Sequence, residues 1–305
     1  MTIQPPSEQS RWRVELGRRV GAAYLRDSKV DAVLIAGSAS RGDADRDSDV
    51  ELMVAWAEPP TDAQRRLIVE PLAVDHRLFE FDDDWECWQE DLFIGRSVAD
   101  VPSSGVLIEV VGQLTPVIER RLDDVVQRFE PNLDKQSTIH ALLNGIPLHG
   151  EELIDSWRAR AEPYPRGLSI AMVDRYAQID YFADWERFLA RGRNLLLIHE
   201  RFTQIERQLL LVLQALNGVY HYKFKWLERV AGELAVAPSD LADRLRSVLT
   251  EDVPTGAETL RQLVEEVYDL VEAELPEIDV ARLRSIFRWR RQAWDAAPPE
   301  ALPAG

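Results

Sequence analysis

The stretch Gly-Ser-Ala-Ser-Arg-Gly-Asp-Ala-Asp-Arg-Asp-Ser-Asp-Val-Glu occupies residues 37–51 of the chain. An apolar run at residues 32–36 precedes it, and a second apolar run at residues 52–56 follows it. This pattern predicts two strands joined by a polar loop that starts with a Gly-Ser turn. Successive side chains of a strand point to opposite faces, so we expect Asp49 and Glu51 on one face where the second strand begins.

The turn and the two acids together predict a type of chemistry. Two carboxylates at a strand end are suited to bind a hard cation such as Mg²⁺. This ion prefers oxygen ligands and keeps some water molecules and substrate phosphates among them. The Gly37-Ser38 turn can offer backbone N–H groups and a hydroxyl to a phosphate. A phosphate cradle beside metal-binding carboxylates is the equipment of phosphoryl or nucleotidyl transfer.

Gly-Ser-x-x-Arg-Gly at residues 37–42, followed by Ser-Asp-x-Glu at residues 48–51, resembles the signature of the DNA polymerase beta-type nucleotidyltransferase superfamily. The closest likeness is to its small-molecule branch, which includes aminoglycoside and lincosamide nucleotidyltransferases. The resemblance is strong over residues 30–56, weaker up to residue 126, and general in the remainder. It implies a Mg²⁺-dependent enzyme that moves a nucleoside monophosphate, from ATP or another nucleoside triphosphate, to a hydroxyl of a small molecule and releases pyrophosphate. An antibiotic is one such acceptor.

A third carboxylate is expected on a later strand. Glu109 is the lone charged residue in the apolar run at residues 105–111, where an unpaired charge would be costly to bury. In the resembled family a third acid lies on a strand next to the Asp-x-Glu strand, as a metal ligand or as the general base for the acceptor hydroxyl, and the resemblance assigns this role to Glu109. Asp75 and Glu80 are the alternatives, because residues 73–81 could supply the adjacent strand instead.

The resemblance implies roles for further residues. Asp49, Glu51 and Glu109 would be the catalytic carboxylates and would hold the metal. The nucleoside triphosphate would be bound by a second set of residues: Gly37, Ser38, Arg41, Lys223 and Lys225. Arg41 could instead fix the turn through a carboxylate of the Asp-rich spacer, and the two lysines could belong to a solvated helix end.

The hydrophobic pattern predicts two domains. Strands are expected at 31–36, 48–56, 73–81 and 105–111, with helices from residue 61 and from residue 115, and an acidic, aromatic helix or lid-like insertion at 82–93. After Pro131 the apolar spacing becomes helical. The predicted fold class is therefore an α+β, mixed-sheet nucleotidyltransferase domain at residues 1–131, followed by an all-α helical bundle at residues 132–305 that binds the acceptor. The tail at residues 296–305 is expected to be disordered.

The amino-acid composition limits the classes of partner and metal site that we expect. The formal net charge of −17 disfavours non-specific binding to nucleic acid, because the phosphate backbone would be repelled. The single Cys87 excludes an internal disulfide and a cysteine-built zinc site. A cytoplasmic location, no membrane partner and a monomer or homodimer are expected. The alternative in another class is an antitoxin-like or regulatory protein of the same fold that acts on or binds a protein partner, but the intact Asp49 and Glu51 pair favours the enzyme.

Overall fold

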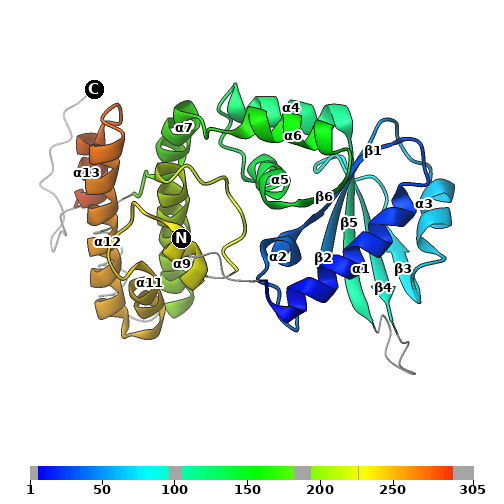
Figure 1. The fold of residues 1–305 in the computed structure, drawn as a ribbon. Helices are drawn as coiled ribbons and strands as arrows, with labels where there is room; N and C mark the ends of the chain where they lie inside the picture. Colours follow the sequence, from blue (N-terminus) through cyan, green and yellow to red (C-terminus); the bar gives the residue numbers. More distant parts are fainter. Residues whose placement is uncertain (1–5, 96–104, 181, 183–193, 226, 291–305) are drawn as a thin grey trace, which may run out of the picture. The chain divides into compact units, whose positions relative to one another are not determined.

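The computed structural model describes residues 6–95, 105–180, 182, 194–225 and 227–290 of the 305-residue chain (Figure 1). The tail predicted to be disordered lies outside these residues. The chain forms two compact units. The first comprises Met1–Leu168 and Tyr220–Lys223, and the second comprises Ser169–Val219 and Phe224–Gly305.

Within the described residues, the first unit is built on a six-stranded mixed sheet with the strand order β3-β4-β5-β2-β1-β6 (Figure 1). The strands are β1 (Val30–Ala36), β2 (Val50–Trp56), β3 (Asp75–Leu78), β4 (Trp88–Ile94), β5 (Val106–Leu114) and β6 (Ile146–His149). β2 and β5 run parallel to each other, and the other neighbouring strands pair antiparallel. The α+β fold class predicted for the first domain is confirmed.

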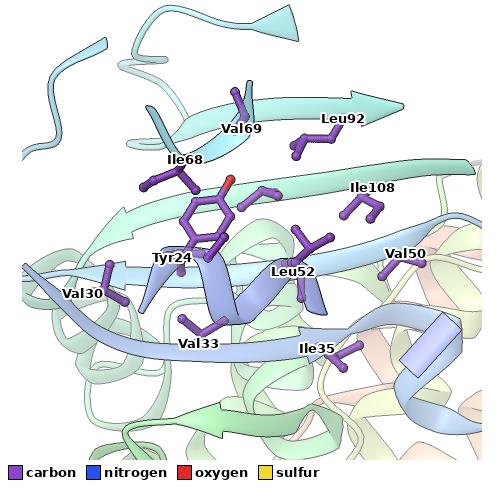
Figure 2. Close-up of a cluster of buried hydrophobic side chains, with 14 of the residues drawn as sticks. Tyr24, Val30, Val33, Ile35, Val50, Leu52, Ile68, Val69, Leu92 and Ile108 are labelled. Atoms are coloured by element: carbon purple, nitrogen blue, oxygen red, sulfur yellow. The ribbon is translucent and has the colours of Figure 1, made fainter. Parts of the chain in front are cut away.

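One face of the sheet carries the main hydrophobic core. α1 (Glu8–Tyr24) and α3 (Asp62–Val69) lie over this face (Figure 1). Figure 2 shows Leu52 of β2 and Ile108 of β5 in the same cluster as Tyr24 of α1, and all three side chains are almost fully buried. Burial of each such aliphatic side chain contributes about 1.5–3 kcal/mol, so this face anchors the strands that carry the candidate site.

The opposite face of the sheet is covered by three other helices: α4 (Thr115–Val126), α5 (Leu133–Asn144) and α6 (Glu151–Ala161). A Cβ on Gly17 of α1 would touch Ile35 of β1, whereas a Cβ on Gly145, just after α5, would meet the neighbouring Leu34. Adjacent residues of a strand point to opposite faces, so α1 and α5 lie on opposite sides of β1.

In the segment predicted as a helix or lid-like insertion, residues 82–93, residues 88–93 belong to strand β4 and residues 83–86 form a turn, so the helix prediction is wrong. Glu90 points into the core and is only 4% exposed. Arg65 of α3 donates from Nε to its Oε1 at 2.7 Å, and the Tyr24 hydroxyl donates to its other oxygen. A charged residue therefore stands where a strand pattern requires an apolar one, which hides the alternation of β4.

The first unit extends beyond the boundary predicted at residue 131. β6 pairs with β1 and so continues the sheet, and α5 and α6 contact β1. The chain then returns at Tyr220–Lys223, where the Tyr220 hydroxyl donates to the Ala161 carbonyl at 2.7 Å and the His221 N–H donates to Gln136 Oε1 at 3.2 Å. Helical spacing after Pro131 is real, but it does not separate helices of the sheet unit from those of the second unit.

The described part of the second unit is helical, as predicted. Its helices are most of α7 (Arg166–Tyr176), α9 (Leu195–Leu216), α10 (Leu227–Glu233), α11 (Leu241–Thr250), α12 (Val253–Glu274) and α13 (Val280–Arg288). The long helices pack through apolar stripes: α12 contacts α9, α11 and α13. In the parts of the chain that the structure describes, no helix combines the length and the apolar character needed to cross a bilayer.

Candidate active site

The turn after β1 lies directly against a carboxylate. Gly37 opens the short helix α2 (Gly37–Arg41) with a φ of 68°, which is in the left-handed region. A Cβ at this position would lie 2.5 Å from both Cδ and Oε1 of Glu51. Only glycine lets the backbone approach so closely in this conformation. The predicted phosphate cradle and the predicted metal-binding acid are therefore in contact.

Three carboxylates form a row across neighbouring strands. In the sheet register, Glu51 of β2 is next to Glu109 of β5, which is next to Asp91 of β4. Leu52 and Ile108, their neighbours in sequence, point into the core on the α1 face. The carboxylate row (Glu51, Glu109 and Asp91) therefore lies on the other face of the sheet.

The pKa of Glu109 reflects this crowding. Burial raises it above its ordinary value, and the negative charges of Asp49, Glu51 and Asp91 raise it further, while the positive charge of Lys223 lowers it. Burial and the neighbouring negative charges raise the pKa together, because each disfavours the ionised form of the carboxyl group. The effect of Asp49 on Glu109 places this acid, which lies just before β2, within electrostatic reach of the row.

The two alternative third acids are elsewhere. β3 is the edge strand, and β4 and β5 separate it from β2. Asp75 of β3 pairs with Phe93, and Glu80 is exposed beyond the end of that strand. Of the three candidates, the structure brings only Glu109 next to the Asp-x-Glu strand.

Asp91 was not found by sequence reasoning. Its signal was the period-two pattern of β4, in which Asp91 alternates with the buried Glu90 and Leu92. That pattern becomes readable only when Glu90 is recognised as a core residue paired with Arg65.

The two candidate lysines are in different units. Lys223 belongs to the returning segment of the first unit and acts on Glu109, whereas Lys225 belongs to the second unit. The segment is held by a ring contact next to Lys223, because Tyr222 stacks on His140 of α5 with 4.4 Å between the ring centroids. Both lysine side chains are exposed.

Arg41 contacts the turn and the returning segment. Its Nε is 3.7 Å from Asp43 Oδ2, in the polar spacer. Its guanidinium carbon lies 5.9 Å from the centroid of the Tyr222 ring. The ion pair corresponds to the turn-fixing role that was the alternative to phosphate binding.

The residues present fit a magnesium ion that takes some of its ligands from the protein and the others from a substrate. Among the described residues, no three His, Cys, Asp or Glu side chains are grouped so that they could hold a metal ion by themselves. Mg²⁺ in phosphoryl-transfer sites is bound through one or two carboxylates together with phosphates and water. Asp49 and Glu51, both partly exposed, offer that donor set. The metal roles of Asp49, Glu51 and Glu109 stay predictions.

No protein-family model matches the chain, and no curated protein is significantly similar to it. Several solved structures are similar at low identity. A nucleotidyltransferase-like protein from Exiguobacterium sibiricum 255-15 is 11% identical over 87% of this chain and 80% of its own, with a TM-score of 0.38. Cid1 in complex with the UTP analog UMPNPP is 12% identical over 44% of this chain and 40% of its own, with a TM-score of 0.27. A CCA-adding enzyme with ATP is 13% identical over 95% of this chain and 72% of its own, with a TM-score of 0.29. Likeness at this level assigns neither an activity nor a residue's role.

Proposed function

We propose that the protein is a nucleotidyltransferase that moves a nucleoside monophosphate, AMP from ATP in the first instance, to a hydroxyl of a small molecule. One observation carries the proposal. The Gly37 backbone lies against the Glu51 carboxylate, and Glu109 is beside Glu51 in the sheet register. A turn that contacts one acid, with a second acid next to it in the sheet register, provides for the triphosphate, its counter-ion and a base within one small region of the sheet.

Each residue contributes a separate part of the chemistry. Gly37 and Ser38 bind the terminal phosphates through backbone N–H groups and the hydroxyl. Asp49 and Glu51 hold Mg²⁺, which when bound neutralises negative charge on the triphosphate.

Glu109 takes the proton of the acceptor hydroxyl. The hydroxyl oxygen then forms a bond to the α-phosphorus, the bond from that phosphorus to the bridging oxygen breaks, and pyrophosphate leaves. Because its pKa is raised, Glu109 is a stronger base than an ordinary glutamate, which favours proton removal near neutral pH.

The net charge of the chain supports the proposed acceptor class. The chain carries a net charge of −17, which suits a cationic small molecule better than a polyanion. An amine-bearing sugar or antibiotic is the proposed acceptor, and a nucleic acid is not. The predicted cytoplasmic location and the predicted monomer or homodimer are retained as part of this proposal.

The test is nucleotide transfer with each of four α-³²P-labelled nucleoside triphosphates and Mg²⁺, on a panel of aminoglycosides, lincosamides, oligoribonucleotides and proteins. We expect label on a small molecule, release of pyrophosphate, and loss of both in Asp49→Asn and Glu51→Gln. Transfer that survives Asp49→Asn would contradict the metal assignment, and label only on RNA would contradict the acceptor class. Tight binding of a protein without turnover would favour the antitoxin-like alternative.

A further inference from the structure

The start of α1 holds the loop between the two halves of the candidate site. The Ser7 N–H donates to the Gly42 carbonyl at 3.0 Å, and the Ser7 hydroxyl donates to the Ala44 carbonyl at 2.8 Å. The Ala44 N–H in turn donates to Ser10 Oγ at 2.9 Å. The first half of the loop at residues 42–48 is thus fixed to the N-cap and first turn of α1 by three hydrogen bonds.

Arg13, one helical turn after Ser10, holds the second half of this loop. Its side chain is buried, with the residue only 2% exposed. Nε donates to the Ser48 carbonyl at 2.8 Å, and Nη2 donates to the Arg46 carbonyl at 3.2 Å. Nη1 donates to Gln9 Oε1 at 2.7 Å, which fixes the guanidinium from the helix side. The Ser48 carbonyl belongs to the peptide that leads into Asp49.

A buried guanidinium at this place is explained by the charges around it. Burial lowers the pKa of Arg13, and Asp45, Asp49 and Asp47 oppose this by favouring the charged form. A guanidinium also carries its donors in a rigid planar fork, so two carbonyls bound by one fork have a fixed relative orientation. A lysine could supply the charge but not this orientation.

We propose that Arg13 is a positioning residue of the active site: by binding the carbonyls of Arg46 and Ser48 it fixes the peptide before Asp49 and so directs the Asp49 carboxylate toward the metal and the triphosphate. This inference rests on the proposed function. It adds a residue from α1, which contributes no side chain to the predicted site. Groups that orient a metal ligand from behind typically contribute 10–100-fold to metal affinity or activity, as an order of magnitude.

The test measures metal binding without turnover. Mn²⁺ replaces Mg²⁺ as a paramagnetic probe, and its affinity is measured by electron paramagnetic resonance with a non-hydrolysable ATP analogue present. We expect Arg13→Lys to weaken Mn²⁺ binding about 10-fold and Arg13→Met by about 10–100-fold. Arg18→Lys and Arg18→Met are matched controls, because Arg18 is exposed on the same helix. These controls should bind Mn²⁺ as the wild type does.

A second comparison separates positioning from general stability. Arg65→Lys disturbs another buried arginine, which pairs with Glu90 on the α1 face of the sheet. We expect it to lower the unfolding temperature and leave Mn²⁺ affinity unchanged. If Arg13→Met does not fold, Arg13→Lys and Ser10→Ala, which loosens the same loop at Ala44, provide the measurement.

Two outcomes would overturn the inference about Arg13. One is wild-type Mn²⁺ affinity in folded Arg13→Lys and Ser10→Ala. The other is an equal loss of affinity in Arg65→Lys at the same loss of stability. A wild-type protein that binds the metal and the ATP analogue but modifies no acceptor would refute the transfer reaction and leave the Arg13 result valid. A wild-type protein that binds neither would refute both proposals.

Discussion

Gly37→Ala is the sharpest perturbation of the candidate site, because one methyl group has two separable effects. The first is backbone strain: the φ of 68° is left-handed, which costs a residue with a side chain about 1–2 kcal/mol. The second is a collision, since the new Cβ would lie 2.5 Å from Glu51 Cδ. Non-bonded carbon atoms approach to about 3.5–4.0 Å, so the carboxyl group must move by roughly 1 Å or more.

The expected consequence for function follows from that displacement. A misplacement of about 1 Å in a catalytic arrangement can cost about 100-fold in rate, which corresponds to about 2.7 kcal/mol of transition-state stabilisation. We therefore expect kcat/KM for nucleotide transfer to fall about 100-fold, with weaker metal-dependent binding of the ATP analogue.

The chain offers a matched control in Gly42→Ala. Gly42 has a φ of 84°, so the strain is similar, but its added Cβ would meet Pro6 Cα at 3.3 Å rather than a carboxylate. Both variants should lose about 1–2 kcal/mol of unfolding free energy in denaturant titrations. Gly37→Ala should lose far more transfer activity than Gly42→Ala, whose added Cβ meets no carboxylate. Equal activity losses in the two variants, or a Gly37→Ala protein with turnover close to the wild type, would refute the reasoning.

Three further results are expected. Burial and neighbouring carboxylates raise the pKa of Glu109 from its ordinary 4.5, so its protonated form contributes stability that is present below pH 4.5 and lost as the pH rises through the raised value. In metal-free thermal unfolding, Glu109→Gln should therefore be more stable than the wild type at pH 8 but not near pH 4. A Tm difference between the two proteins that does not change with pH would contradict this. Arg65→Met leaves the buried Glu90 carboxylate without its counter-ion and should cost about 3–5 kcal/mol in urea unfolding. Glu90→Leu should restore part of this loss in the double variant, because the carbonyls of Phe79 and Gln89 still lack their Arg65 donor. An additive double variant would show that the pair is not coupled. Lys223→Ala removes a positive charge that lowers the pKa of Glu109, so the acid limb of the pH profile of kcat/KM should move to higher pH. Lys225→Ala should leave that limb in place. The same pH profile for both variants would show that Lys223 is not part of the site.

The strand, turn and strand around residues 37–51 could be predicted because local pattern and site chemistry coincide there. Both strands have buried, apolar runs, and the polar loop between them begins with a glycine in a left-handed conformation. The place of Glu109 in a strand could be predicted for the same reason, since it is the charged exception in an apolar run; its role in the site stays a prediction. Each of these features depends only on residues within one short segment of the sequence.

What escaped prediction depends on contacts between distant segments. Glu90 is in the core because Arg65, 25 positions away, neutralises it, and no local pattern reveals that pairing. Arg13 looks like one more charged residue of an amphipathic helix until Ser48, 35 positions away, is found at its Nε. β6 was missed because it is a four-residue strand, Ile-Pro-Leu-His, that contains a proline and follows a helix.

The return of the chain at Tyr220–Lys223 has a consequence for synthesis on the ribosome. The sheet unit lacks these residues until the whole of Ser169–Val219 has been made, because the partners of Gln136 and Ala161 lie beyond it. At roughly 5–20 residues per second, the delay between Leu168 and Lys223 is on the order of 3–10 s. During that time Gln136 and Ala161 of the nascent first unit lack their hydrogen-bond partners, and a fragment that ends at Leu168 would lack them permanently. The segments of the two units therefore alternate along the chain, so the first unit is completed only after part of the second has been synthesised.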